Sequence, residues 1–203
     1  MEFHIKAWSR LLNEDLQANM DFAAVKAQMY GKNTELFERV FGIGHFTNEQ
    51  MQEMSFKKER IYQEIYKPHL KLIDGLGAFL EKSSALQIPM AIGSAAIPFN
   101  INFVLDNLDL HKYFPVIVSA DDVLLSKPHP ETYLKCAAEL HVHASDCIVF
   151  EDAPKGVEAA QNAGMKCVVI LANLHTEAEF ATYANILHFI RSYDEIEPAE
   201  LFG

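Results

Sequence analysis

The sequence predicts an α/β protein in which a helical segment precedes a parallel-sheet core. Helical periodicity without a convincing strand runs through residues 1–67, where apolar residues spaced three and four apart indicate amphipathic helices. From Pro68 onward, short apolar runs alternate with helical patterns, as expected for parallel βαβ units. We therefore expect a helical domain at residues 1–67 and an α/β domain at residues 68–203.

The helical segment is expected to form a small bundle of three helices. The stretch Gly31-Lys32-Asn33-Thr34 interrupts it and offers an N-cap, and the glycines between Phe41 and His45 predict a loop. The expected apolar faces are His4, Ala7, Trp8, Leu11 and Leu12; Leu36, Phe37, Val40 and Phe41; and Met51, Met54, Ile61, Tyr62 and Ile65.

The α/β segment contains five short apolar runs that predict strands. These are Ile88–Ile92, Val116–Ser119, Cys147–Phe150, Cys167–Leu171 and, as an edge strand, Ile186–Ile190. Helices are predicted by apolar faces at Leu76, Phe79, Leu80 and Leu86; at Tyr133, Leu134, Ala137 and Ala138; and at Val157, Ala160 and Ala163, with Gly164 ending the last of them.

Charge and cysteine content limit the kinds of partner. The formal net charge is −11 and the pI about 5.2, so no attraction to nucleic acid or anionic lipid is expected. Cys136, Cys147 and Cys167 lack a paired metal-binding spacing, which favours buried thiols in a reducing cytosol. Because the first ten residues lack the apolar centre of a signal peptide and no apolar run has membrane length, we expect a cytoplasmic protein.

Two adjacent carboxylates, Glu151 and Asp152, follow the third predicted strand. Ligands of open α/β sheets gather at the carboxyl ends of strands. Neighbouring carboxylates repel each other, and a hard cation such as Mg²⁺ between them removes that repulsion. The alternative from this stretch alone is an acidic loop in which Asp152 caps the following helix.

Ser94 and Lys127 follow the first and second predicted strands. Ser94 and Ala95 form a small-residue turn before a helix, so the hydroxyl either caps that helix or holds an anion. Pro128 and Pro130 stiffen the backbone around Lys127, although a lysine is usually a solvated surface residue. A parallel sheet brings these groups and the acid pair to one edge, where a hydroxyl, a cation and metal-binding acids suit phosphoryl transfer.

Three motifs resemble those of a known superfamily in order and spacing. They are Ile92-Gly93-Ser94-Ala95, Ser126-Lys127-Pro128-His129-Pro130 and Phe150-Glu151-Asp152-Ala153-Pro154-Lys155-Gly156. They resemble the second, third and fourth motifs of the haloacid dehalogenase superfamily, and most closely its β-phosphoglucomutase-like phosphatases. The resemblance covers the whole chain and implies a Rossmann-like parallel-sheet core with an N-terminal helical cap.

The resemblance also implies roles for individual residues. Ser94, with Ala95 beside it, would bind the phosphoryl group, and Lys127 would balance the charge between that group and the nucleophile. Glu151 and Asp152 would hold Mg²⁺, one of them through water. From the cap, Lys32 and His4 would contact the substrate.

The first motif of the superfamily, a strand ending in Asp-x-Asp, has no match in this sequence. In the superfamily its first Asp takes the phosphoryl group and its second acts as general acid and base. Since the opening from Glu2 to Trp8 resembles the start of the first cap helix, we expect the nucleophile upstream of Met1 and expect the chain as written to be inactive. The missing strand would be central in the sheet, between the strands that lead to Ser94 and Glu151.

The expected function is that of an Mg²⁺-dependent phosphohydrolase. Its substrate would be a small phosphorylated metabolite such as a sugar phosphate, and the reaction would pass through a phosphoaspartate. A phosphosugar mutase of the β-phosphoglucomutase type is the close alternative, and an inactive protein that binds a phosphometabolite is the alternative of another class. A phospho-receiver domain is disfavoured, because receivers place their acid pair at the first strand. The sequence makes no prediction of oligomeric state.

Overall fold

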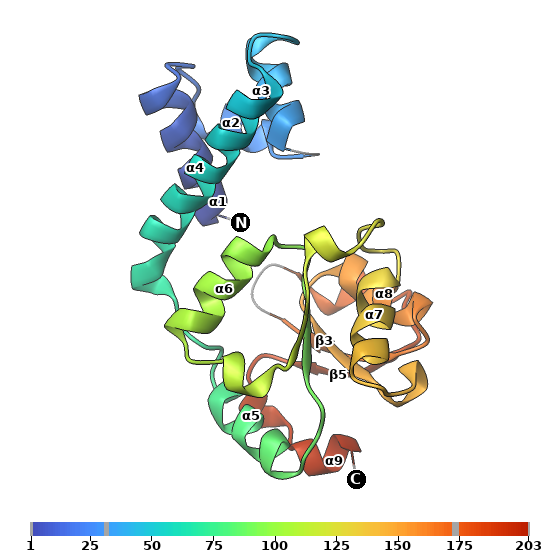
Figure 1. Cartoon of the computed structure of the whole chain (residues 1–203). Helices are drawn as coiled ribbons and strands as arrows, with labels where there is room; N and C mark the ends of the chain where they lie inside the picture. The colour runs from blue at the N-terminus through green and yellow to red at the C-terminus, as the bar shows by residue number, and fades with distance from the viewer. Residues whose placement is uncertain (1, 31–32, 172–174, 203) are drawn as a thin grey trace. The chain divides into compact units, whose positions relative to one another are not determined.

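The computed structural model describes residues 2–30, 33–171 and 175–202. It consists of two compact units, Met1–Leu70 and Lys71–Gly203, the first helical and the second α/β (Figure 1). The α/β class with a helical N-terminal region is thus confirmed.

The described residues of the first unit form four α-helices. They are α1 (Glu2–Arg10), α2 (Phe22–Gln28), α3 (Asn33–Phe41) and α4 (Asn48–Tyr66). A π-helical turn, Leu11–Asp15, continues α1, and a 3-10 turn, Lys67–His69, follows α4. The short helix α2 was not predicted, because seven residues with Val25 as their only buried member carry too little periodicity. Its start is fixed by Asp21, whose side chain accepts a hydrogen bond from the Ala24 amide at 2.8 Å.

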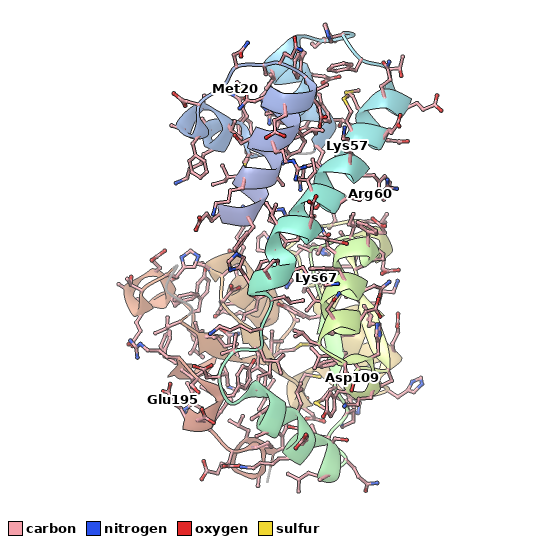
Figure 2. All side chains as sticks on the ribbon, turned by 90° about the vertical axis from the view of Figure 1, so that its left-hand side faces the viewer. Met20, Lys57, Arg60, Lys67, Asp109 and Glu195 are labelled. Carbon is pink, nitrogen blue, oxygen red and sulfur yellow. The ribbon has the colours of Figure 1, made fainter. Side chains whose placement is uncertain are left out.

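An apolar cluster joins these helices. Trp8 packs edge-on against Phe37, with ring centroids 5.3 Å apart, and both side chains are buried. The long helix α4 begins with a reciprocal cap in which Thr47 and Gln50 bond each other's amides. Lys57, Arg60 and Lys67 lie along α4 and its extension (Figure 2).

The part of the second unit that the structure describes forms five parallel strands in two separate sheets. They are β1 (Ala91–Gly93), β2 (Val116–Val118), β3 (Ile148–Glu151), β4 (Lys166–Ile170) and β5 (Ile186–Ile190). β1 pairs with β2, and the other three pair in the order β3-β4-β5. All five predicted strands are present, and β5 is an edge strand as expected. The first is shorter than predicted, because β2 offers it only three partners and no described strand pairs with its other edge.

Helices cover both faces of the sheets. α7 (Glu131–Glu139) packs on β1 and β2, and α8 (Pro154–Asn162) packs on β3 and β4. Phe79 of α5 (Leu76–Ala85) packs against Val168 and Ile190 on the opposite face. α6 (Pro98–Asn107) joins α5 in a further cluster through Leu105 and Leu80.

The predicted apolar faces need two corrections. On α7 the buried face is Thr132, Tyr133, Cys136 and Ala137, whereas Leu134 and Ala138 are exposed. The face is turned by one residue because α7 packs through the small side chains Cys136 and Ala137. Leu86 lies just beyond the end of α5 and is also exposed.

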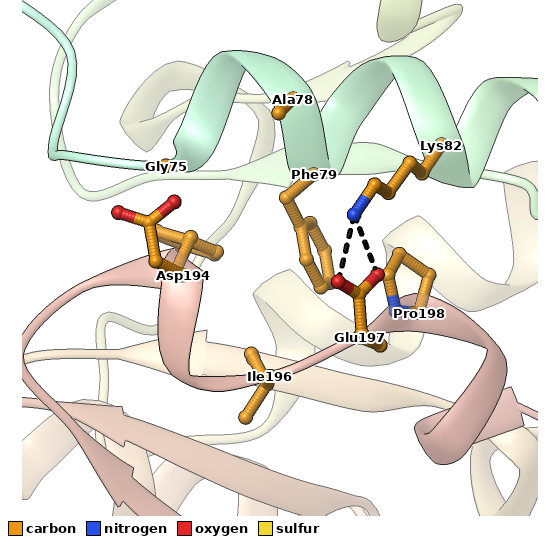
Figure 3. Close-up of a pocket in the computed structure, with 9 residues that line it drawn as sticks. Gly75, Ala78, Phe79, Lys82, Asp194, Ile196, Glu197 and Pro198 are labelled. Atoms are coloured by element: carbon orange, nitrogen blue, oxygen red, sulfur yellow. Dashed lines mark hydrogen bonds and ion pairs between the residues drawn. The ribbon is translucent and has the colours of Figure 1, made fainter.

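The C-terminal segment packs on α5 around a small hollow (Figure 3). Lys82 pairs with both oxygens of Glu197 at 2.7 and 2.8 Å, and both side chains are about half exposed, so the pair contributes little to stability. Gly75 adopts φ +79°, and a Cβ there would collide with the backbone and side chain of Asp194. The residues around this hollow therefore pack α5 against the C-terminal segment. Among the residues that the structure describes, every helix is too short or too polar to span a bilayer.

Candidate active site

Lys127 is the centre of a polar cluster at the carboxyl ends of β1 and β3. Its Nζ donates to the Gly93 carbonyl at 3.2 Å, to the Tyr133 hydroxyl at 2.7 Å and to Glu151 Oε1 at 2.5 Å. Gly93 ends β1 and Glu151 ends β3. The structure therefore brings the second, third and fourth motifs together through one ammonium group.

The loop that carries Lys127 is held from both sides. The Lys127–Pro128 peptide is cis, and the His129 amide bonds the Ser126 carbonyl at 3.0 Å. The Glu131 carboxylate, which follows the loop, accepts hydrogen bonds from the amides of Leu124 and Leu125, which precede it, both at 2.9 Å. The Lys127 side chain is only 14% exposed, and its ammonium is held in one position by its three hydrogen-bond partners.

Both carboxylate oxygens of Glu151 have partners. Oε1 accepts from Lys127 and from the Tyr133 hydroxyl, each at 2.5 Å, and Oε2 accepts from the amides of Asp152 and Ala153 at 3.1 and 3.4 Å. A Cβ on Gly156 would overlap this carboxylate. The glycine of the fourth motif thus gives Glu151 the room to turn back over the start of α8.

Asp152 is an exposed residue beside this partly buried network. Partial desolvation of its carboxylate and, after it, the negative charge of Glu151 raise its pKa. A cation beside Asp152 would relieve both effects, and Mg²⁺ needs only one or two protein carboxylates when waters and phosphate oxygens complete its shell. The two carboxylates therefore fit Mg²⁺, and the exposed Asp152 is more available to bind it than Glu151, whose oxygens both have protein partners. Within the described ranges, no group of three His, Cys, Asp or Glu side chains forms a metal cluster.

Ser94 lies directly after the Gly93 carbonyl that Lys127 contacts. Its amide donates to the Val118 carbonyl at 2.9 Å, which extends the β1–β2 pairing by one residue. Its hydroxyl accepts from the Ala96 amide at 3.0 Å and so closes a short turn around Ala95. The serine is in place at the sheet edge, and its hydroxyl has a local backbone partner.

His4 and Lys32 are the two predicted substrate contacts in the helical unit. The His4 ring stacks on Tyr62 with centroids 3.9 Å apart, and its Nδ1 lies 3.3 Å from Lys58 Nζ. Burial and the Lys58 charge lower the pKa of His4 to about 4, so the ring is neutral at pH 7. Lys32 lies outside the described residues.

Lys58 is a buried cation that the sequence analysis did not identify. It is 3% exposed, donates to Glu59 Oε1 at 2.5 Å and lies 5.4 Å from the centre of the Trp8 ring. The signal is its spacing, since it stands four residues after Met54 and four before Tyr62, on the apolar face of α4. A charged residue at such a position is buried only when it has partners.

The sequence motifs do not identify Tyr133, because its spacing predicts only a place on the apolar face of α7. It is buried, and its hydroxyl bonds both Lys127 and Glu151. Burial, and after it the charge of Glu151, raises the pKa of Tyr133, which keeps the hydroxyl protonated and able to donate.

The chain is an α/β protein with a helical N-terminal segment, and its parallel sheets carry a fixed ammonium, a serine turn and two carboxylates at one edge. The family model described as "Haloacid dehalogenase-like hydrolase" matches residues 1–170. The chain belongs to this family.

Several relatives are named as phosphatases. The chain is 32% identical over 153 residues to a phosphorylated carbohydrates phosphatase of Thermotoga maritima, a match that covers 69% of this chain and 71% of the relative. It is 42% identical over 80 residues to the fructose-1-phosphate phosphatase YqaB of Escherichia coli, covering 39% of this chain and 43% of that one. The matches span between 40% and 43% of the length of the first three relatives.

Solved structures share the fold. A family IA, variant 3 hydrolase of Entamoeba histolytica superposes with a TM-score of 0.81 at 24% identity, covering 100% of this chain and 91% of the other. A β-phosphoglucomutase of Clostridium difficile gives a TM-score of 0.74 at 22% identity, with coverages of 98% and 88%. At these identities the likeness concerns the fold.

Proposed function

We propose that this chain forms the cap and core of an Mg²⁺-dependent phosphohydrolase of the cytoplasm, acting on a small phosphorylated metabolite such as a sugar phosphate. The observation that carries the proposal is the position of the Lys127 ammonium, which contacts the Gly93 carbonyl and the Glu151 carboxylate at once. A phosphoryl group at this edge would have a fixed cation and the Ser94 turn beside it. The relatives named as sugar phosphatases support this substrate class.

Each residue has a distinct part in this proposal. Lys127 offsets the charge that develops on the phosphoryl oxygens, and Ser94 with the adjacent amides binds those oxygens. Asp152 would hold Mg²⁺ directly and Glu151 would act through water, because both of its oxygens already have protein partners. When bound, Mg²⁺ would supply charge neutralisation at the phosphoryl group.

The attacking carboxylate is not among these residues, since all four have binding or charge-balancing parts. We propose that it belongs to a segment outside residues 1–203 and that it forms the phosphoaspartate. Lys32 and His4 remain proposed cap contacts to the substrate.

The test is phosphate release from p-nitrophenyl phosphate and from fructose 1-phosphate, with Mg²⁺ or with EDTA. It uses residues 1–203 and, in parallel, the same protein with any residues that its reading frame encodes before Met1. Turnover that EDTA abolishes is expected in the longer form. Lys127→Met should lower it by roughly 10²–10³, the usual effect of removing one preorganised electrostatic group.

A matched control is Lys112→Ala, which removes a surface lysine paired with Asp109 at 2.7 Å and should leave turnover unchanged. A mutase would transfer phosphate between sugar positions and release little inorganic phosphate. Binding of the phosphosugars without turnover in either form would contradict the enzyme proposal and favour a binding protein.

A further inference from the structure

His175 is a basic side chain that follows β4, at the edge of the sheet where Lys127 and Asp152 lie. β3 and β4 are parallel neighbours, and Glu151 at the end of β3 pairs in register with Val169 of β4. The chain therefore leaves both strands at the same edge. Asp152 comes directly after β3, and His175 lies in the segment that follows β4. None of the three sequence motifs contains this histidine.

The ring of His175 is held through one of its two nitrogens. Nδ1 lies 2.7 Å from Glu179 Oε2. Because an ionised carboxylate only accepts hydrogen bonds, Nδ1 carries the proton in the neutral ring and Nε2 keeps its lone pair. Among the residues that the structure describes, Nε2 has no hydrogen-bond partner. His175 therefore offers one directed acceptor to a ligand.

The partner of His175, Glu179, is itself fixed. Its Oε1 accepts from the Thr176 amide at 2.9 Å and from the Thr176 hydroxyl at 3.3 Å. The bond to His175 and, after it, the bond from the Thr176 amide lower the pKa of Glu179, so the carboxylate is ionised at neutral pH. Phe180, the next residue, is 1% exposed and belongs to the apolar cluster that includes α8. The turn that orients the ring is thus anchored in the core.

The pKa of Asp152 responds to the charge of His175. Desolvation and then the charge of Glu151 raise this pKa, and among the side chains whose charge opposes the rise, His175 acts more strongly than Lys127. The His175 side chain is 30% exposed, so a ligand in solvent can reach it. The imidazole therefore lies in the surroundings of Asp152, on an accessible part of the edge.

The order of the strands determines what His175 can contact. Lys127 joins the ends of β1 and β3, so a phosphoryl group beside it lies on the β1 side of Asp152. β4 lies on the other side of β3, and His175 follows β4. Mg²⁺ usually keeps several of its waters when one or two carboxylates and a phosphate bind it. With the phosphate on the Lys127 side, such waters are expected on the His175 side.

We propose that His175 helps to hold Mg²⁺ at Asp152 through a coordinated water, which donates a hydrogen bond to Nε2 while Glu179 orients the ring. His175 is in this sense a positioning residue, because it acts on the metal through the water. Direct coordination by Nε2 is disfavoured, since Mg²⁺ takes oxygen ligands. The proposal rests on the Mg²⁺ site of the proposed function.

The test measures the affinity for Mn²⁺, which takes the same oxygen ligands as Mg²⁺ and whose free form is quantified by electron paramagnetic resonance. It uses residues 1–203 and the longer form with any residues that the reading frame encodes before Met1, at pH 8, where an ordinary histidine is neutral. His175→Phe keeps a ring beside Phe180 but lacks the acceptor, and should lower the affinity about tenfold. His175→Gln, whose amide oxygen accepts, should recover most of this loss.

The matched control is His111→Phe, at a surface histidine paired with Asp106 at 2.8 Å, which should leave the Mn²⁺ affinity unchanged. Circular dichroism verifies that each variant is folded. Asp152→Asn tests the metal site itself. If Asp152→Asn leaves the affinity unchanged, the proposed metal site is wrong, and the part of His175 falls with it. If Asp152→Asn lowers the affinity and His175→Phe does not, only the part of His175 is wrong.

Two further outcomes would overturn the proposal. Equal losses in His175→Phe and His175→Gln would show that the shape of the ring matters and the acceptor does not. Strong ¹⁴N modulation in the electron spin echo of bound Mn²⁺, absent in His175→Gln, would show that the imidazole binds the metal directly and not through water.

Discussion

The Tyr133 hydroxyl donates to Glu151 Oε1 at 2.5 Å and accepts from Lys127 Nζ at 2.7 Å. Tyr133 thus links the cation and the anion of the site from within α7. Its hydroxyl is in contact with both groups that the sequence motifs identified, and it fixes their relative position.

Tyr133→Phe should lower the free energy of unfolding by roughly 1–3 kcal/mol, the usual cost of removing one partner from a buried, charge-assisted hydrogen bond. Urea denaturation measures the effect. The control is Tyr30→Phe at a tyrosine that is 61% exposed, for which a change within about 0.5 kcal/mol is expected. Equal losses in the two variants would mean that the Tyr133 hydroxyl does not support the site.

Gly156→Ala sets two effects against each other. Alanine favours a helix over glycine by about 1 kcal/mol, but a Cβ at Gly156 would overlap the Glu151 carboxylate, and overpacking costs about 1–3 kcal/mol. We expect net destabilisation. In the control Gly77→Ala of α5, the new Cβ would meet only Leu72 Cδ1 at 3.6 Å, so stabilisation is expected.

A double-mutant cycle with Glu151→Ala isolates the overlap at Gly156. If the carboxylate is the obstacle, Gly156→Ala should cost less in the Glu151→Ala background than alone. The same cost in both backgrounds would place the obstacle elsewhere.

The His4 site predicts a pH dependence of stability. The pKa of His4 is about 4 in the folded protein against 6.5 for the free side chain. As pH falls from 6.5 toward 4, the unfolded chain takes up a proton that the folded chain does not, so stability decreases, and below about pH 4 this loss ends. The slope is at most about 1.4 kcal/mol per pH unit, the limit for one proton. Because the ring is only partly buried, the total loss of stability is smaller than the full pKa difference would give.

Thermal unfolding at pH 7.5, 6.5 and 5.5 checks this prediction against His4→Phe, which keeps an aromatic ring beside Tyr62 but does not titrate. Since acidic groups elsewhere affect both proteins alike, the difference between the two is the measured quantity. The Tm of the unsubstituted protein should fall more steeply. Parallel pH profiles would contradict a neutral His4.

Magnesium binding should depend on Asp152 more than on any other single carboxylate. In calorimetry of residues 1–203 with MgCl₂, binding is expected to be weak, and Asp152→Asn should weaken it further by at least about tenfold. Asp109→Asn, at a side chain that is 85% exposed, serves as the control. Tight binding that Asp152→Asn leaves unchanged would show that the metal lies elsewhere.

The sequence was sufficient for the strands, because each is a short apolar run bounded by turn residues. It was insufficient where tertiary packing determines whether a short helix forms or which face of a helix is buried. The helix α2 has only one buried residue, so its pattern is weak. The buried face of α7 depends on what the helix packs against, and for this reason the prediction for Leu134 and Ala138 is wrong.

The same distinction holds for the site. Lys127 and Glu151 stand in recognisable motifs after strands, and the parallel topology explains why they meet. The contacts of the Tyr133 hydroxyl and of the Lys58 ammonium are seen only in three dimensions, because apolar spacing predicts that a side chain is buried but not what its polar end contacts. For Lys58 the unusual position of a charge on an apolar face was a signal that spacing alone contained.

The division of the sheet has a consequence for how the α/β unit unfolds. The β3-β4-β5 sheet shares its clusters with α8 and Phe79, whereas Ile92 and Ile117 of the β1–β2 sheet cluster with α6 and Leu80. Hydrogen exchange in proteins follows such local groupings, which open with different free energies. We therefore expect two cooperative units in this one domain. They are coupled through α5, whose adjacent residues Phe79 and Leu80 belong one to each, and through α7, which packs on β1 and β2 while its Tyr133 clusters with Val169 of β4.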